Sequence, residues 1–121
     1  MRPLFHPEIA EVPLEAILHA LSDPARVTLF VDIVGRECSQ NCSTLQAVLE
    51  KPIAKSTLSQ HFKVLREAGL IRSERRGVEM LNTARCAEVE ARYPGLLAAI
   101  VKAHSIQRQA EAEKTSRPAG S

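Results

Sequence analysis

The chain has 121 residues, of which 45% are apolar and 3% aromatic, and it contains no Trp. A chain of this length accommodates one domain with a modest aliphatic core and excludes a second domain. No run approaches the roughly 18 apolar residues of a membrane helix, and no basic, apolar leader precedes Pro13. The three cysteines are an odd number, which argues against a disulfide framework and favours a reducing compartment, the cytoplasm.

The positive charge of the chain is concentrated in one segment. The net charge is +2, but residues 51–76 hold seven basic and two acidic side chains and therefore carry +5. Residues 1–50 carry −4 and residues 77–121 carry +1. Such asymmetry is typical of a surface that docks on a phosphate backbone, although a solvated basic face would give the same charge. Charge alone leaves both interpretations open.

Two helices are predicted at the start of the domain. The first is short and carries one apolar stripe at helical spacing: Leu14, Ile17, Leu18 and Leu21. Asp23 can cap the second helix, and Pro24 suits its first position, where a missing N–H costs nothing. The second helix is apolar on most sides up to Gly35, so we expect it to be the buried centre of the domain.

Two further short helices predict a helix-turn-helix arrangement. Residues 43–46 read S-x-x-Q, a capping box that opens a third helix, and Lys51-Pro52 closes it. Gly69 followed by Leu70 ends a fourth helix. The inner face of this fourth helix carries three apolar residues at helical spacing: Leu58, Phe62 and Leu65.

A hairpin and a last, longer helix are predicted next. Gly77, directly after Arg75-Arg76, suits the turn between short strands over residues 70–74 and 78–81. Thr83 can cap a short helix that runs through Glu90, and the longer helix starts at Pro94. This longer helix carries one mostly apolar stripe: Tyr93, Leu96, Leu97, Ile100, Val101 and His104.

These elements predict a mainly α domain with a small β-hairpin, an α+β fold of the winged helix-turn-helix type. The expected order is four helices, two strands and a last long helix. Residues 1–12 form an N-terminal extension, residues 13–106 the DNA-binding and dimerisation domain, and residues 107–121 a flexible polar tail.

The exposed face of the fourth helix is the most informative surface. Once the apolar residues point inward, the other face carries polar and basic groups: Lys55, Ser56, Thr57, Ser59, Gln60, His61 and Lys63. Hydroxyls, amides and imidazoles hydrogen-bond base edges, whereas lysines and arginines such as Arg75 and Arg76 neutralise phosphates. A helix in the major groove, with an arginine hairpin beside it, would use all of these groups. The sequence therefore predicts that residues 54–76 bind double-stranded operator DNA; the alternative is a solvated amphipathic helix beside a basic turn.

Three stretches of the chain resemble the ArsR/SmtB family of winged-helix repressors. They read Ala-Leu-Ser-Asp-Pro-Ala-Arg over residues 20–26, Ser-Thr-Leu-Ser-Gln-His-Phe over 56–62 and Leu-Arg-Glu-Ala-Gly-Leu-Ile over 65–71. The resemblance spans residues 13–104. It implies a homodimer built from the first and last helices, DNA binding in the free state, and release when an inducer binds.

The resemblance also assigns the residues that would contact DNA. Those that match the family's recognition helix are Ser56, Thr57, Ser59, Gln60 and His61, and those that match its wing are Arg75 and Arg76. Many members have a capping Ser where this chain has Ala54, so the resemblance does not fix the start of the recognition helix to within one turn. Neither metal motif of the family is intact: its C-x-C pair reads Asn41-Cys42-Ser43 here, and His104 is followed three residues later by Gln107. We therefore assign no metal site.

The cysteines support a weaker hypothesis. Cys38 and Cys42 lie in the loop before the third helix, and Cys42 directly precedes its capping box, where a helix N-terminus favours the thiolate. A redox switch or a site for a thiophilic metal or metalloid would use both, with Cys86 as a candidate third ligand. Ordinary structural cysteines are the alternative.

Surplus apolar stripes on the first and last helices predict a twofold dimer. The expected interface consists of Leu14, Ile17, Leu18, Leu96, Leu97, Ile100 and Val101. No residue pair suggests an activated nucleophile, so we expect a repressor and not an enzyme. Two alternatives remain: a winged-helix protein-interaction module, which should expose apolar anchors where this chain is polar, and a small thiol enzyme that uses Cys38 and Cys42.

Overall fold

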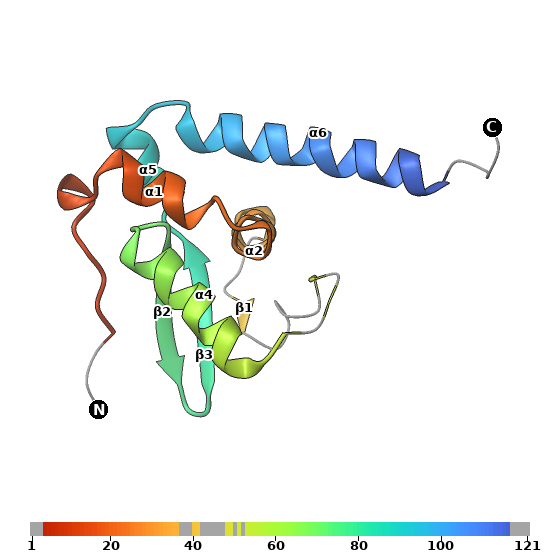
Figure 1. Ribbon diagram of the computed structural model, residues 1–121. Helices are drawn as coiled ribbons and strands as arrows, with labels where there is room; N and C mark the ends of the chain where they lie inside the picture. The colour runs from red at the N-terminus through yellow and green to blue at the C-terminus, as the bar shows by residue number, and fades with distance from the viewer. Residues whose placement is uncertain (1–3, 37–39, 42–47, 50, 52, 117–121) are drawn as a thin grey trace.

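A computed structural model of the chain describes residues 4–36, 40–41, 48–49, 51 and 53–116. The elements are η1 Ile9–Glu11, α1 Leu14–Ala20, α2 Pro24–Gly35, β1 Gln40–Asn41, α4 Lys55–Glu67, β2 Ile71–Arg76, β3 Glu79–Ala84, α5 Cys86–Arg92 and α6 Leu96–Ser116 (Figure 1). Helices with one small hairpin form the α+β fold that the sequence predicted. The predicted third helix falls almost entirely outside the described residues.

The start of α2 is fixed by its cap. Oδ1 of Asp23 accepts hydrogen bonds from the backbone N–H groups of Ala25, at 2.8 Å, and Arg26, at 3.2 Å. Pro24 occupies the first helical position, as predicted. These features satisfy N–H groups that have no partner within the helix. The buried side chains of Leu29 and Phe30 then make α2 the centre of the core.

The end of α4 explains why Gly69 follows it. The N–H of Leu70 donates to the carbonyl of Leu65 and the N–H of Gly69 donates to that of Arg66, which is the Schellman arrangement. Gly69 has a φ of +76°, a conformation that L side chains rarely adopt. A Cβ at this position would also lie 2.9 Å from Cδ1 of Ile9, so the N-terminal segment packs directly against the helix end.

Strands β2 and β3 form an antiparallel hairpin, in which Ile71 pairs with Ala84 and Arg76 pairs with Glu79. Gly77 has a φ of +62° in the turn between the strands. The short strand β1, which the sequence analysis did not predict, pairs with β3. The strand order is β1-β3-β2, so β2 lies at an edge of the sheet.

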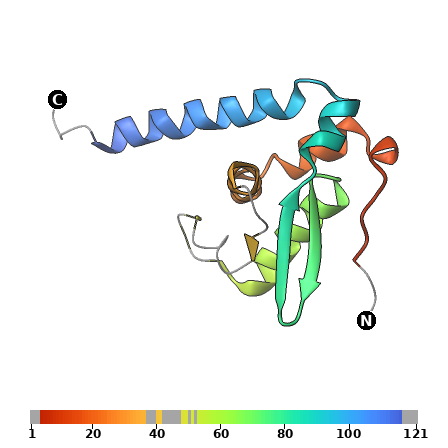
Figure 2. The same cartoon turned by 180° about the vertical axis from the view of Figure 1, so that it is seen from behind.

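The core lies between the helices and the base of the hairpin. Its buried apolar residues are Val12, Ile17, Ala20, Leu29, Phe30, Ile33, Leu58, Phe62, Leu65, Ala68, Leu70, Ile71, Val89 and Leu97. Helix α6 crosses one end of the fold, and its C-terminal half extends beyond the other elements (Figures 1 and 2). The tip of the hairpin points away from α6 at the opposite end (Figure 1). Within the described ranges, no helix is both long and apolar enough to cross a membrane.

Several predicted boundaries were wrong. Thr83 lies in β3 opposite Arg72 and does not cap a helix, because pairing with β2 continues to Ala84. Helix α5 therefore begins at Cys86, after Arg85 at its N-cap. The last helix begins at Leu96 and not at Pro94, since a turn with Gly95 at a φ of +86° precedes it.

Both ends of the predicted domain also need correction. Val12 is buried in the core and Ile9 packs against it, so the packed domain begins before residue 13. Helix α6 continues to Ser116, although the sequence analysis expected a frayed tail from Gln107. Residues 117–121 lie outside the described part of the chain.

Candidate nucleic-acid interface

Helix α4 has one buried and one exposed face. Leu58, Phe62 and Leu65 are buried in the core, as the helical spacing predicted. The opposite face exposes six of the predicted DNA-binding residues: Lys55, Ser56, Thr57, Ser59, Gln60 and Lys63. Lys63 has only a long ion pair, 4.0 Å from Nζ to Oε1 of Glu67, between two exposed side chains. A pair of this kind contributes little to stability, so the ammonium group remains available to a phosphate.

Helix α4 begins next to Ala54, the position at which this chain departs from the capping Ser of many family members. Ala54 is the N-cap, with an extended backbone and no side chain that could accept a hydrogen bond. The first-turn N–H groups of the helix therefore have no side-chain cap, and Lys55 stands at the first helical position. Such N–H groups and the positive end of the helix dipole favour a bound phosphate.

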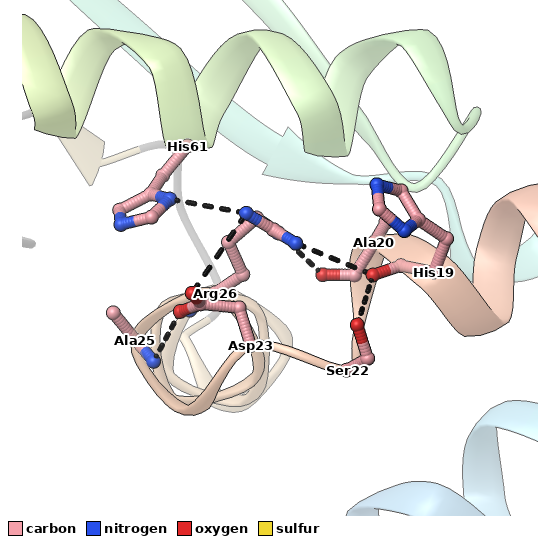
Figure 3. A network of polar contacts seen from close by, with 7 residues as sticks. All are labelled: His19, Ala20, Ser22, Asp23, Ala25, Arg26 and His61. Atoms are coloured by element: carbon pink, nitrogen blue, oxygen red, sulfur yellow. Dashed lines mark hydrogen bonds and ion pairs between the residues drawn. The ribbon is translucent and has the colours of Figure 1, made fainter.

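Arg26 joins the turn between α1 and α2 to the inner side of α4. Its Nε donates to the carbonyl of Ala20 at 2.7 Å and its Nη2 donates to the carbonyl of His19 at 3.3 Å. Nη1 lies 3.4 Å from Nδ1 of His61 and 3.9 Å from Oδ2 of Asp23 (Figure 3). The Arg26 side chain is only 12% exposed, so these bonds are shielded from water. Arg26 therefore fixes α4 relative to the first two helices.

His61 is half-buried, and the structure corrects its predicted position on the open face. Its ring points toward Arg26 and not away from the protein (Figure 3). Because a guanidinium group only donates, this contact is a hydrogen bond in the tautomer that has its proton on Nε2 and a free lone pair on Nδ1. Nε2 lies on the side of the ring turned away from Arg26 (Figure 3). His61 thus combines a packing contact with one outward-facing donor.

The β2–β3 hairpin, hereafter the wing, carries the two predicted arginines near its tip. Arg75 and Arg76 are exposed at the end of β2, directly before the turn. Nε of Arg76 lies 3.4 Å from Oε1 of Glu74, and both side chains are about two-thirds exposed. This surface pair is weak in water, so it competes little with a phosphate. The structure therefore brings a basic hairpin tip and the polar face of α4 into one domain.

The predicted sensor residues are only partly described. Cys38 and Cys42 lie outside the described residues. Cys86 is half-buried at the start of α5, where burial and the nearby Glu90 raise the pKa of its thiol, against a backbone hydrogen bond that lowers it. A raised thiol pKa disfavours the thiolate that oxidants and soft metals attack. Among the described residues, no cluster of three metal-ligating side chains occurs.

His104, the remaining residue of the family's last-helix metal motif, faces α2. Its Nε2 lies 3.4 Å from Oγ1 of Thr28. Burial lowers the pKa of His104, with a further contribution from Arg108, while Glu111 acts in the opposite direction. His104 therefore serves a contact between helices in the described chain.

The predicted dimer residues fall into three groups: buried, exposed and half-buried. Ile17 and Leu97 are buried in the core of the chain itself, so their assignment to an interface was wrong. Leu14 and Leu18 are 40% and 48% exposed on α1. The other three are half-buried on α6: Leu96, Ile100 and Val101. Ile106, which the sequence analysis did not assign, is 60% exposed on the same helix.

Two structural contributions were missed in the sequence. Arg26 belongs to the quoted motif over residues 20–26, but its bonds to the carbonyls of α1 depend on a turn that spacing does not reveal. His6 accepts a hydrogen bond from the N–H of Ser73, 67 residues away, and no local sequence pattern predicts such a contact. In the sequence, the only indication of the contact made by Arg26 is that this arginine follows the predicted break between the first two helices.

Helix α4 with its exposed polar face, followed by the basic β2–β3 hairpin, is the arrangement of a winged-helix domain. The sequence model of the family described as "Bacterial regulatory protein, arsR family" matches residues 52–73, which span α4 and the start of the wing. A comparison with curated protein sequences finds no match.

Solved structures with the same fold support this resemblance. NolR from Sinorhizobium fredii is 25% identical over 83% of this chain and 96% of its own, with a TM-score of 0.56. An ArsR-like transcriptional regulator from Rhodococcus sp. RHA1 is 23% identical over 86% and 92%, with a TM-score of 0.55. The transcriptional repressor BigR from Xylella fastidiosa is 24% identical over 64% and 76%, with a TM-score of 0.53.

These matches confirm the resemblance to the ArsR family and its winged-helix fold. The matched family and the Rhodococcus and Xylella proteins are described as regulators and not as enzymes, in agreement with the prediction.

Proposed function

We propose that this protein is a sequence-specific DNA-binding transcriptional repressor that leaves its operator when an inducer binds. The observation that carries this proposal is the outer face of α4, where six polar or basic side chains stand exposed beside a wing tipped by Arg75 and Arg76. Helices of this kind enter the major groove, and the wing then follows the adjacent backbone. A DNA-binding regulator of this type works in the cytoplasm, where an odd number of cysteines is compatible with reduced thiols.

The exposed groups divide into two roles by their chemistry. Ser56, Thr57 and Gln60 carry hydroxyl and amide groups that distinguish base edges. The basic side chains hold phosphates and contribute affinity without sequence preference. They are Lys55, Lys63, Arg75 and Arg76. His61 can add one donor through Nε2, because its Nδ1 is engaged by Arg26.

The proposal includes a homodimer. Leu14, Leu18 and Ile106 expose large apolar side chains on α1 and α6, at the opposite end from the wing. Ala99, Ala103 and Ala110 are exposed on the same side of α6 as Ile106, at helical spacing. Small residues allow a second helix to approach closely, and a twofold partner would bury this surface. Two copies of α4 would then bind an imperfect palindrome.

Selection from a pool of random DNA duplexes tests the function directly. The full chain is expected to enrich an imperfect palindrome whose half-sites lie about one helical turn apart. Its affinity for the enriched duplex should exceed that for the starting pool by about a thousandfold or more at physiological salt. The variant Gln60→Ala with Ser56→Ala should retain folding but lose most of this preference. Equal affinity for the enriched and random duplexes would contradict the proposal.

The inducer is proposed to act at Cys38 and Cys42, through oxidation or a thiophilic metal or metalloid. In the sequence both cysteines lie between α2 and α4, so a ligand that binds them would bias the orientation of α4. Cys86 is a poor third participant because the pKa of its thiol is raised.

The inducer proposal is tested by titrating the selected duplex with and without peroxide and arsenite. A coupling of about 1–3 kcal/mol should weaken wild-type binding several-fold to a hundredfold. The variant Cys38→Ser with Cys42→Ser should not respond, whereas Cys86→Ser should respond like wild type. An equal loss of DNA binding in all three proteins would rule out these cysteines as the switch.

A further inference from the structure

The N-terminal segment over residues 4–12, hereafter the strap, is tied to the fold by long-range hydrogen bonds. Nη1 of Arg85 donates to the carbonyl of Pro7 at 3.0 Å, and Nη1 of Arg92 donates to that of Ala10 at 2.6 Å. Oη of Tyr93 donates to the carbonyl of Val12 at 2.9 Å. The strap runs beside the hairpin in both views of the molecule (Figures 1 and 2). It is therefore part of the packed domain.

His6 lies where the strap meets the wing. The backbone N–H of Ser73, in the middle of β2, donates to Nε2 of His6 at 3.0 Å. β2 is an edge strand, and an edge strand leaves backbone donors without a neighbouring strand. Ser73 is 4% exposed, so water does not readily replace this acceptor. The imidazole of His6 thus takes the place of a strand partner.

The same serine connects the wing to α4. Oγ of Ser73 donates to Oδ1 of Asn82 on β3 at 2.8 Å, and Nη1 of Arg66 on α4 donates to Oγ of Ser73 at 3.4 Å. Asn82 is fully buried. One short network therefore links the strap, both strands of the wing and the last turn of α4. This network is one of the contacts that join the wing to α4.

We propose that His6 is a positioning residue for DNA binding: its neutral imidazole anchors the strap to Ser73 and holds the wing beside α4, and protonation of His6 releases that anchor. The proposal rests on the proposed function for its effect on DNA. Nε2 can accept the Ser73 N–H only while it carries no proton. An imidazolium donates from both nitrogens, so it would leave the buried Ser73 N–H without an acceptor.

The charges around His6 also oppose protonation. Burial lowers the pKa of His6, and Arg72 on β2, Arg66 on α4 and Arg85 before α5 lower it further, whereas a backbone hydrogen bond at Leu4 acts in the opposite direction. Glu88 on α5 bonds to Arg85 and lies 3.7 Å from Arg72, so it is a counter-charge to both of these arginines. With the folded pKa below the ordinary value of about 6.5, the anchor is complete above that pH and is lost as the pH falls through the folded pKa.

Two substitutions of His6 distinguish the loss of the hydrogen bond to Ser73 from the effect of protonating the imidazole. His6→Ala removes the acceptor, so hydrogen exchange at the Ser73 amide should accelerate roughly tenfold at neutral pH, the equivalent of one hydrogen bond. His6→Gln supplies a carbonyl oxygen at a similar reach without a titrating proton, and exchange should stay near the wild-type rate. Phe5→Ala, which removes the neighbouring exposed ring, is the matched control and should change nothing.

Binding to the duplex selected above then tests the effect on DNA. Between about pH 7.5 and pH 5.5, wild type should lose about fivefold or more in affinity relative to His6→Gln. His6→Ala should be weaker than His6→Gln at both pH values. Parallel pH profiles of wild type and His6→Gln, or unchanged Ser73 exchange in His6→Ala, would overturn the proposal. Failure of every variant to bind any selected duplex would instead contradict the proposed function, and the exchange measurements on the free protein distinguish these cases.

Discussion

The surface formed by α4 and the wing differs in kind from the surface formed by α1 and α6. On the first, α4 exposes hydroxyl, amide and basic side chains and buries its apolar ones, such as Phe62, whereas Val78 in the turn of the wing is fully exposed. The second exposes large apolar side chains, with Leu14 at 40%, Leu18 at 48% and Ile106 at 60%. The tip of the wing and α6 lie at opposite ends of the fold (Figure 1). One end therefore suits a polyanion, and the other suits a second protein surface.

This difference shows why a helical pattern alone does not define function. Both α4 and α1 are amphipathic, but only α4 finds enough partners within the chain to cover its apolar face. On α1 the core takes Ile17 and leaves Leu14 and Leu18 uncovered. Several large apolar side chains exposed on neighbouring helices are typical of an interface, whereas a single exposed one, such as Val78, is ordinary.

The largest expected effect comes from adding charge to the apolar surface. Leu14→Glu with Leu18→Glu should convert a dimer at micromolar concentration into a folded monomer in analytical ultracentrifugation. Loss of the second half-site contact should weaken binding to the palindrome by about 100-fold or more. Ala87→Glu with Ala91→Glu adds the same charge to exposed positions of α5 and should leave both properties intact. An unchanged sedimentation coefficient in the first variant would remove this surface from the dimer.

A smaller effect is expected when Arg26, which connects the first two helices to α4, is replaced. Arg26→Ala leaves the carbonyl of Ala20 without its donor and frees His61, so the free energy of unfolding should fall by about 1–3 kcal/mol. Arg36→Ala removes an exposed ion pair with Asp32 and should cost less than about 1 kcal/mol. Urea denaturation of both variants measures the difference, and equal stabilities would contradict a structural role for Arg26.

Gln60→Ala should affect specificity without affecting the fold. Because Gln60 is exposed on α4, its loss should leave the free energy of unfolding unchanged within about 0.5 kcal/mol. Discrimination at one base pair of the half-site should fall by about 1–3 kcal/mol in competition binding. Gln107→Ala on α6 is the matched control and should retain full discrimination. A uniform loss over all base pairs would show that Gln60 holds the backbone instead.

The smallest effect is expected at the wing. Arg76→Ala removes one phosphate contact, so binding should weaken for all sequences alike. The slope of log K against log salt should then decrease in magnitude by about 1. Arg36→Ala, an exposed arginine far from the wing in the sequence, should leave the slope unchanged. A change of sequence preference at constant slope would assign Arg76 to a base contact.

Local patterns predicted most of the fold because most of its elements follow from short-range chemistry. The cap at Asp23, the spacing of Leu58 and Phe62, and the glycines at positions 69 and 77 act within a few residues, and each is present as predicted. The predictions failed where a contact with a segment distant in the sequence determines the conformation or burial of a residue.

Three long-range contacts account for those failures. Thr83 could cap a helix, but pairing with β2 keeps it in a strand. His61 fits the exposed motif, yet Arg26 draws its ring toward α2. Ile17 and Leu97 share stripes with the other residues predicted for a dimer interface, and the core of the same chain covers them. These features depend on contacts between residues far apart in the sequence, which leave no periodic pattern in it.

Chemical-shift mapping by NMR tests the proposed DNA surface most directly. The amide resonances of the uniformly labelled chain are recorded with and without the selected duplex. We expect the largest changes at residues 55–63 of α4 and at residues 75–78 of the wing, with small changes at Leu14 and Leu18. If the changes instead concentrated on α1 and α6 and left α4 and the wing unaffected, DNA recognition by this surface would be contradicted.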